Sequence, residues 1–394
     1  MQLYWSNQLK NLTYCLQNLF NYFLIMALFS KAGYTQHLPT TIGPKALLNR
    51  FQTILDSVYT QHPEVKGMSI YLVSSEQKCL WYGAIGKANA NNDTLTVEHP
   101  VNIASVTKIF VAAAILKLVE QNKFSIETPI INLVSSETKQ LLQLADYDLN
   151  QIKVKHLLGN TSGIFDFVNT KEFQDKTIQN PKYIWTLPEQ IALAANNGKK
   201  RFNPSEQFEY SETNYLILAE ILSIAENQPY HLAVKKLLHF KKLNLTNTWF
   251  LHQEQQPEGL LPLAEQTAKT YQVNSLTLHP SFDAFGGGGL ASTVHNMAQF
   301  GAYLFEGKIF EKTSTLSLMC KPIEQHQGNF DYALGLAITK VNQHTAFGHG
   351  GFWGTQLKYI PDLKLSIGVY VLERDAWPIY NILIEKLVEA MENQ

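Results

Sequence analysis

The sequence predicts an α/β (α+β) fold in which one antiparallel sheet is assembled from both ends of the chain, with flanking helices and an inserted helical lobe. Strand-like runs occur near residues 68–85 and again at 332–372. Between about residues 105 and 300 they almost vanish and helical patterns dominate. Hydrophobic residues form 45% of the 394 residues, which is enough to build a core and excludes disorder as the main state.

The N-terminal half of this pattern begins with a helix. From residue 45, apolar residues recur every three or four positions, which predicts an amphipathic helix. Two β-prone runs, residues 68–73 and 79–85, flank a polar turn and predict a hairpin. Ile109–Val119 and Asn214–Ala225 are apolar on nearly every side, so both are expected to be buried helices.

The C-terminal part returns to strand-like sequence. Residues 332–338 and 357–360 are expected to be extended. A Pro361-Asp362 turn then leads to an apolar strand over 365–372, and a helix over 379–391 closes the chain.

The chain is longer than one ordinary core, so two lobes are expected. Residues 45–105 and 300–394 form the predicted α/β lobe with the antiparallel sheet, and residues 106–299 form a mainly helical lobe. The segment Gln253–Phe282, with scattered proline and glutamine, is expected to be irregular. The active site is expected between the lobes.

Residues 1–32 have the features of a signal peptide. Lys10 precedes the apolar run Leu19–Phe29, and Ser30-Lys31-Ala32 is a small-x-small cleavage site. The run is shorter than the roughly 20 residues that a membrane-spanning helix needs, so no transmembrane helix is expected in the mature chain. A periplasmic or secreted location follows. The alternative is a cytoplasmic protein whose chain begins with an exposed helix.

Composition and motifs exclude several partners. The net charge is −1, which offers no basic field for a nucleic acid. No H-E-x-x-H motif and no Cys/His cluster occur, so no metal is expected. Gly286–Ala291 fits G-x-G-x-x-A but follows no predicted strand, so no dinucleotide and no other cofactor is expected. The sequence leaves open whether Cys79 and Cys320 pair.

The motif S-x-x-K occurs three times, at Ser75-Lys78, Ser105-Lys108 and Ser136-Lys139. The first lies in the hairpin turn and the third in a polar run, so both are expected at the surface. Ser105-Lys108 directly precedes a buried helix, and one helical turn places the two side chains on one face. A serine becomes nucleophilic when a neighbouring base takes its proton, and a helix N-terminus favours a developing oxyanion.

This motif belongs to an ordered set. The segments in question are Asn102–Lys108, Leu157–Ile164, Phe202-Asn203-Pro204 with Phe208–Ser211, and Gly348–Gly354. In that order they resemble the active-site motifs of the serine β-lactamase and penicillin-binding D,D-peptidase family, which includes class C β-lactamases, D-alanyl-D-alanine carboxypeptidases and related esterases. The resemblance spans about residues 51–389 and implies a β-lactamase/transpeptidase-like fold.

The resemblance also implies roles for individual residues. Ser105 would be the acylated nucleophile, and Lys108 and Tyr210 would share the proton transfers. His349 would line the opposite wall and help to fix the tyrosine and the acidic end of the substrate. The backbone N–H groups of Ser105 and Phe352 would form the oxyanion hole. Substrate-binding positions would be Glu212, Gly350 and Gly351.

Glu212 departs from the family pattern, which has Tyr-x-Asn where this chain has Tyr210-Ser211-Glu212. An ionised glutamate only accepts hydrogen bonds, whereas an asparagine amide also donates them. A carboxylate here would keep Lys108 charged and repel anionic donors, which puts turnover of β-lactams in doubt.

The predicted function is a serine hydrolase that acts through an acyl-enzyme, most like a D,D-carboxypeptidase or β-lactamase-related peptidase or esterase. Its partner would be a small-molecule or peptide acyl donor: a peptidoglycan-like peptide, an ester or a β-lactam. The alternatives are a class C-like β-lactamase, and a penicillin-binding module with little turnover.

Overall fold

The structure is a computed structural model that describes residues 38–325 and 331–393. The predicted signal peptide lies outside the described residues and stays a prediction. Every element below belongs to one unit, Thr41–Gln394. Within the described part of the chain, no helix has both the length and the apolar character needed to cross a membrane.

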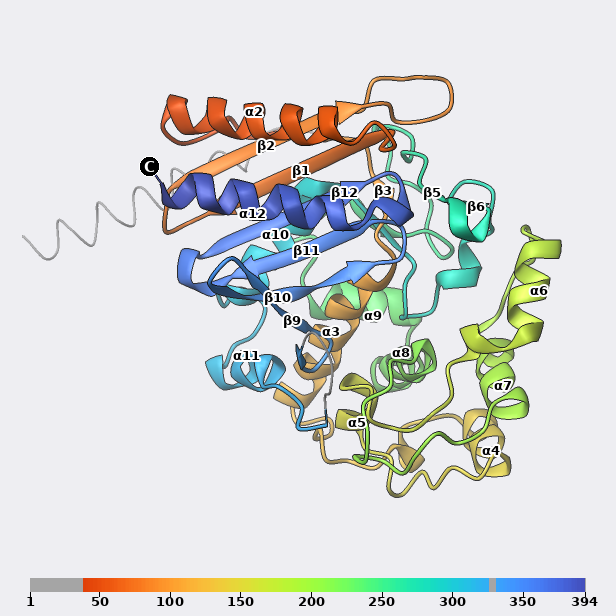
Figure 1. The fold of residues 1–394 in the computed structure, drawn as a ribbon. Coiled ribbons are helices and arrows are strands. Elements are labelled where there is room, and N and C mark those ends of the chain that lie inside the picture. The colour runs from red at the N-terminus through yellow and green to blue at the C-terminus, as the bar shows by residue number, and fades with distance from the viewer. Residues whose placement is uncertain (1–37, 326–330, 394) are drawn as a thin grey trace, which may run out of the picture. The chain divides into compact units, whose positions relative to one another are not determined.

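A seven-stranded antiparallel sheet is built from both ends of the chain, as predicted (Figure 1). Its spatial order is β2-β1-β12-β11-β10-β9-β8. The strands β1 and β12, far apart in sequence, pair with Ile70 opposite Val369. The strands are β1 Gly67–Ser74, β2 Cys79–Gly86, β8 Asp331–Tyr332, β9 Ala337–Val341, β10 His344–Gly351, β11 Thr355–Ile360 and β12 Leu365–Val371.

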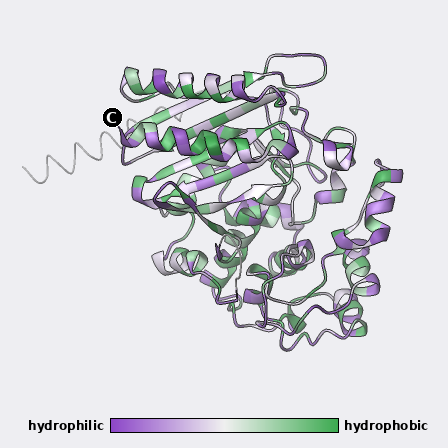
Figure 2. Ribbon diagram, in the orientation of Figure 1, coloured by the Kyte–Doolittle hydropathy of each residue, from purple (hydrophilic) through white to green (hydrophobic). Residues whose placement is uncertain are grey.

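Helices cover both faces of this sheet. The terminal helices α2 (Lys45–Gln61) and α12 (Pro378–Glu392) share a core with Ile367 and Val369 of β12. Figure 2 shows hydrophilic and hydrophobic residues alternating along both helices, as expected of helices that bury one side. Gly368 faces the other way and packs against α10 (Val294–Phe305), because successive residues of a strand point to opposite faces.

The segment between the two halves of the sheet is mainly helical. Both predicted buried helices are present, as α3 (Thr107–Glu120) and α8 (Glu212–Glu226), and α3 is buried along almost its whole length. The other helices are α4 Ser136–Leu144, α5 Val154–Leu158, α6 Lys171–Gln179, α7 Leu187–Asn197, α9 Tyr230–Leu237 and α11 Thr313–Cys320. The division of the chain into two lobes stays a prediction.

Short elements depart from the expectations. Residues 332–338 do not form one extended run, because a tight turn between β8 and β9 is closed by the Ala333 N–H donating to Leu336 O. The segment Gln253–Phe282 is mostly irregular but contains a two-stranded ribbon, β5 (Thr267–Ala268) and β6 (Val273–Asn274). A small sheet, in the order β3-β7-β4, was not predicted. Its strands are β3 Val101–Asn102, β7 Leu290–Ser292 and β4 Thr248–Phe250.

Single 3₁₀ turns complete the fold. They are η1 Ala104–Val106, η2 Ile130–Asn132, η3 Phe167–Asn169, η4 Lys269–Tyr271, η5 Pro280–Asp283, η6 Pro361–Leu363 and η7 Arg374–Ala376.

Candidate active site

Ser105 lies in η1, the 3₁₀ turn that connects β3 to the buried helix α3. The preceding residue Ala104 has φ +45°, a left-handed conformation that a residue with a Cβ rarely adopts. Two contacts hold it there: the Ala104 N–H donates to Asn102 Oδ1 at 2.9 Å, and the Ile103 N–H donates to Leu290 O at 2.9 Å. Strained backbone that the surroundings enforce is common at functional sites, and here it presents a partly exposed serine.

Lys108 is fully buried on the first turn of α3 and contacts three oxygens. Its Nζ lies 3.2 Å from Ser105 Oγ, 2.6 Å from Gly287 O and 2.5 Å from Glu212 Oε2. Gly287 belongs to the glycine run Gly286–Ala291, for which the sequence predicts a flexible or closely packed loop and no dinucleotide site. A Cβ at Gly287 would collide with the Glu212 carboxylate. The glycine run therefore serves the lysine site through its backbone.

Glu212 is the first residue of α8, and its carboxylate touches both members of the S-x-x-K pair. Oε1 accepts a hydrogen bond from Ser105 Oγ at 3.3 Å while Oε2 pairs with Lys108. Its side chain is 14% exposed. The structure thus places Glu212 within the site, in direct contact with the candidate nucleophile.

The loop predicted around Leu157–Ile164 holds the start of α8. Asn160 accepts at Oδ1 from the Ser211 N–H at 3.2 Å and from Asn214 Nδ2 at 2.9 Å. Ser162 Oγ donates to Asn214 Oδ1 at 2.6 Å. The asparagine therefore fixes the residues on either side of Glu212, a role that sequence reasoning missed.

Tyr210 lies beside the lysine, with Lys108 Nζ 4.9 Å from the centre of its ring. Its hydroxyl is buried and has no hydrogen-bond partner among the described residues. Burial, and then the negative charge of Glu212, raise the pKa of Tyr210 well above its ordinary value. The hydroxyl therefore stays protonated at neutral pH and is available to donate to a bound ligand.

His349 lies on β10, with its ring centre 5.9 Å from that of Tyr210. Nδ1 is 2.7 Å from Gly350 O, so this nitrogen carries a proton and donates it. Nε2 then accepts from Tyr332 Oη at 3.2 Å. Burial, and then the charge of Lys108, lower the pKa of His349 to about 4. The imidazole is thus neutral at physiological pH, and its hydrogen-bonded partner is Tyr332 rather than Tyr210.

Tyr332 was not predicted as a site residue. It is fully buried at the end of β8, two strands away from His349. Its contact with His349 depends on the turn that separates β8 from β9.

The two backbone donors predicted for an oxyanion hole, at Ser105 and Phe352, belong to adjoining segments. Thr355 Oγ1 donates to Ile103 O at 2.9 Å, which ties the end of β10 and the start of β11 to the turn that carries Ser105. A Cβ at Gly351 would clash with Ile103 O. Glycine at 351 therefore permits this close approach. The space around Gly350 is less crowded.

Two buried carboxyl groups near the site were not predicted. Asp166 precedes η3, and Asp283 ends η5 with its Oδ2 unpartnered among the described residues. Burial, and then the negative charge of Glu212, raise the pKa of each above its ordinary value. Neither aspartate belongs to a motif singled out from the sequence, although Asp166 follows Ile164 by two residues and Asp283 precedes Gly286 by three.

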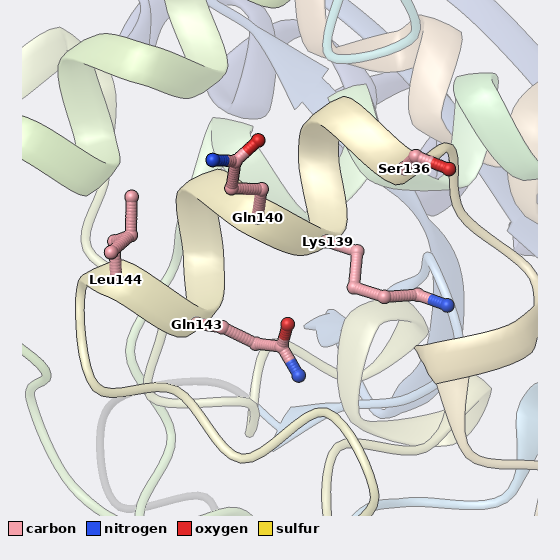
Figure 3. A pocket seen from close by; sticks show the side chains of 5 residues that line it. All are labelled: Ser136, Lys139, Gln140, Gln143 and Leu144. Carbon is pink, nitrogen blue, oxygen red and sulfur yellow. The ribbon is translucent and has the colours of Figure 1, made fainter.

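The other two S-x-x-K pairs do not form comparable sites. Ser75 is exposed in the turn between β1 and β2. Ser136 begins α4, and Figure 3 shows it with Lys139 on the outside of that helix, beside a hollow also lined by Gln140, Gln143 and Leu144. Neither motif has a buried lysine, as expected from their polar surroundings.

Metal and disulfide chemistry find little support in the described part of the chain. No group of three or more histidine, cysteine, aspartate or glutamate side chains is arranged to hold a metal ion there. Cys79 and Cys320 are free thiols, so the pairing left open by the sequence does not occur.

The fold and the site together define the class of protein to which this chain belongs. A model of the family described as Beta-lactamase matches residues 55–375. The chain therefore belongs to the Beta-lactamase family, whose members are β-lactamase-like serine hydrolases.

The relatives that this chain matches share only about a quarter or less of its residues in the aligned segments. The chain is 22% identical over 273 residues to the D-alanyl-D-alanine-carboxypeptidase/endopeptidase AmpH of Escherichia coli K12, an alignment that covers 69% of this chain and 66% of that protein. It is 26% identical over 211 residues to the protein flp of Staphylococcus aureus, which covers 52% and 39% of the two chains. The chain thus spans two thirds or less of the length of these relatives.

Solved structures support the fold class. D-amino acid amidase from Ochrobactrum anthropi SV3 superposes with a TM-score of 0.73 at 21% identity, covering 89% of this chain and 99% of that one. A D-stereospecific amidohydrolase from Streptomyces gives 0.71 at 22%, covering 87% and 98%. A penicillin-binding protein homologue from Pyrococcus abyssi gives 0.69 at 21%, covering 88% and 77%. The predicted β-lactamase/transpeptidase-like fold is confirmed.

Proposed function

We propose that this protein hydrolyses amide or ester acyl donors through an acyl-enzyme on Ser105, as a peptidase or esterase related to β-lactamases. The observation that carries the proposal is the contact of a partly exposed Ser105 Oγ with both Lys108 and Glu212. A serine held between a fixed cation and a carboxylate is set up for nucleophilic attack. Lys108 would hold the charge of the attacking oxygen, and Tyr210 would donate a hydrogen bond to the leaving group.

We further propose that the donor is neutral or carries an amine. Glu212 brings a negative charge to the site, and Asp166 and Asp283 lie close enough for that charge to act on them. An anionic donor would be repelled by the Glu212 carboxylate as it enters. One of the similar structures is named a D-amino acid amidase and another a D-stereospecific amidohydrolase, which supports amides as donors.

Substrate profiling tests this function. Three p-nitroanilides of D-alanine are compared: the free amine, the N-acetyl derivative and the anionic N-succinyl derivative, each with its L-enantiomer. We expect kcat/KM for the first two to exceed that for the third by at least about tenfold, which corresponds to about 1.4 kcal/mol of repulsion. Turnover must disappear in Ser105→Ala.

Other outcomes would contradict the proposal. Equal rates for the anionic and cationic donors would remove the role assigned to charge. Rapid hydrolysis of a cephalosporin would indicate a class C-like β-lactamase. A persistent penicillin adduct on Ser105, with no turnover of any amide or ester, would indicate a penicillin-binding module.

We also propose export to the periplasm or the medium, on the basis of the N-terminal sequence pattern alone. N-terminal sequencing of the protein from fractionated cells tests this. A chain that begins after Ala32 in the exported fraction would support it, and an intact chain in the cytoplasm would contradict it.

A further inference from the structure

Three groups lie near Ser105 Oγ: the Lys108 amine, the Glu212 carboxylate and the Tyr210 hydroxyl. The raised pKa of Tyr210 keeps its hydroxyl protonated, so the lysine and the carboxylate are the two groups that could take the proton of Ser105. The family resemblance assigns the proton transfers to Lys108 and Tyr210. In this chain the asparagine of the second motif is replaced by a glutamate that contacts the lysine. The number of hydrogens that Lys108 and Ser105 supply to the contacts between these groups decides between the two acceptors.

Four short contacts connect the groups: Lys108 Nζ to Glu212 Oε2, to Gly287 O and to Ser105 Oγ, and Ser105 Oγ to Glu212 Oε1. An ammonium supplies three hydrogens and the serine hydroxyl supplies one, so each contact receives one hydrogen. A neutral amine has only two. The serine would then turn its hydrogen to the lysine, and its oxygen would face the carboxylate with no hydrogen between them.

The electrostatic environment favours the same assignment. Lys108 is fully buried and, among the described residues, its anionic contact is Glu212, so a neutral amine would leave the carboxylate uncompensated. The charged pair therefore keeps Lys108 as an ammonium that has no lone pair to accept a proton. The carboxylate keeps free lone pairs on Oε1, directed at the serine hydroxyl.

We propose that Glu212, and not Lys108, is the catalytic residue that accepts the proton of Ser105 during acylation. This rests on the proposed function, in which Ser105 is the nucleophile.

The step balances as follows. Ser105 Oγ forms a bond to the acyl carbon while its proton moves to Glu212 Oε1, and the carbonyl electron pair moves onto the carbonyl oxygen. When the carbonyl re-forms, the bond to the leaving amine or alcohol breaks, and the leaving group takes up a proton from Glu212. Lys108 remains a cation throughout. Water attacks the acyl-enzyme in the reverse sense, giving its proton to Glu212, which returns one to Ser105 Oγ.

Several other ionisable groups surround Glu212. They are Lys108 on α3, Tyr210 before α8, Tyr215 within it, Asp166 before η3, Asp283 in η5, Tyr332 on β8 and His349 on β10. The tyrosines and His349 are neutral near pH 7 by the directions of their pKa shifts, which leaves Lys108 as the counter-charge. Any pH profile of acylation includes contributions from the two aspartates.

The test is the stopped-flow rate of acylation by a neutral p-nitrophenyl ester, measured from pH 5 to pH 10. Glu212→Gln keeps the shape of the side chain and removes the acceptor. We expect its acylation rate at pH 7 to fall at least 100-fold. Under lysine catalysis the same variant would be as fast as the wild type or faster, because the carboxylate that holds Lys108 charged is gone.

Two controls distinguish the loss of the proton acceptor from other effects of a substitution at Glu212. Glu209→Gln removes a carboxylate three residues away that pairs with Arg201 at the surface, and its rate must equal that of the wild type. Formate added to Glu212→Ala supplies a replacement carboxylate and must restore acylation in proportion to its concentration. This rescue also covers the case in which Glu212→Gln folds poorly.

The inference and the proposed function fail in different ways. If acylation of the wild type does not occur on Ser105, as judged by peptide mapping of the adduct, the proposed function is wrong. If it occurs on Ser105 but Glu212→Gln acylates at the wild-type rate at pH 7 and formate has no effect on Glu212→Ala, the proposed function stands and Glu212 is not the acceptor.

Discussion

Lys108 and Glu212 are 104 residues apart in sequence, yet Lys108 Nζ lies 2.5 Å from Glu212 Oε2 at the meeting point of the two buried helices α3 and α8. Burying a charge is tolerated when a partner compensates it, and removing one partner of a buried pair typically costs about 3–5 kcal/mol. The pair therefore contributes both to the stability of the fold and to the proposed reaction, because the same carboxylate that compensates Lys108 also contacts Ser105.

The first prediction concerns the nucleophile. Ser105→Ala should abolish covalent labelling by a serine-reactive fluorophosphonate, because Ser105 is the S-x-x-K serine that lies beside a buried lysine. Ser75→Ala and Ser136→Ala are matched controls from the two exposed motifs and should label like the wild type. Labelling is followed by intact-mass measurement. An adduct that persists in Ser105→Ala would move the nucleophile elsewhere.

The second prediction concerns Gly351. A Cβ there would overlap both Ile103 O and Thr355 Oγ1, so Gly351→Ala should push the end of β10 away from the turn that carries Ser105. We expect kcat to fall about 10- to 100-fold, because shifts of about 1 Å have effects of this size. Gly307→Ala is the control, with φ +76° and no atom within 4 Å of the added Cβ. It should lose roughly 1 kcal/mol of stability and keep full activity. Equal activity of the two variants would contradict the assignment.

The third prediction concerns the hydroxyl of Tyr332. Tyr332→Phe removes the donor to His349 Nε2 and leaves that buried acceptor unsatisfied. At about 1 kcal/mol for one hydrogen bond, we expect kcat to fall about fivefold with little change in KM. Tyr59→Phe removes a hydroxyl bonded to Lys66 O, on the outer helix α2, and serves as the control. A positioning role is excluded if the kinetics of both variants match those of the wild type.

The fourth prediction concerns pH and Asp283. Burial, and then the charge of Glu212, raise the pKa of Asp283 to about 8, whereas the unfolded chain has its ordinary value near 4. Between these values the folded state holds a proton that the unfolded state has lost. The contribution to stability is thus full below about pH 4 and is lost as the pH rises towards 8, by at most about 1.4 kcal/mol per pH unit.

Asp283→Asn removes this titration. Thermal unfolding of the wild type should therefore shift to lower temperature between pH 5 and pH 8 more steeply than that of the variant, in buffers of constant ionic strength. Glu209→Gln, an exposed carboxylate, should follow the wild-type curve. Parallel curves for the wild type and Asp283→Asn would show that Asp283 does not titrate in this range.

Sequence patterns predicted the long elements well, because the apolar pattern of a long helix or strand is visible in one local stretch of sequence. The helix from residue 45 has a clear apolar periodicity, and the helix that follows Ser105 is apolar on nearly every side. Both α2 and α3 begin within two residues of the expected places. Strands of two or three residues such as β3 and β7 were missed, because runs so short carry no periodic signal and are held by their neighbours.

For this protein the sequence alone determined the fold class, the sheet assembled from both ends, and the single S-x-x-K motif placed before a buried helix. These follow from periodicity and from spacing within one turn, which are local properties. Only the tertiary structure decided that Gly287 O and Glu212 converge on Lys108, that His349 pairs with Tyr332, and that two aspartates are buried near the site. The physical reason is that contacts between distant segments, and the removal of a charge from water, depend on the packing of the whole chain.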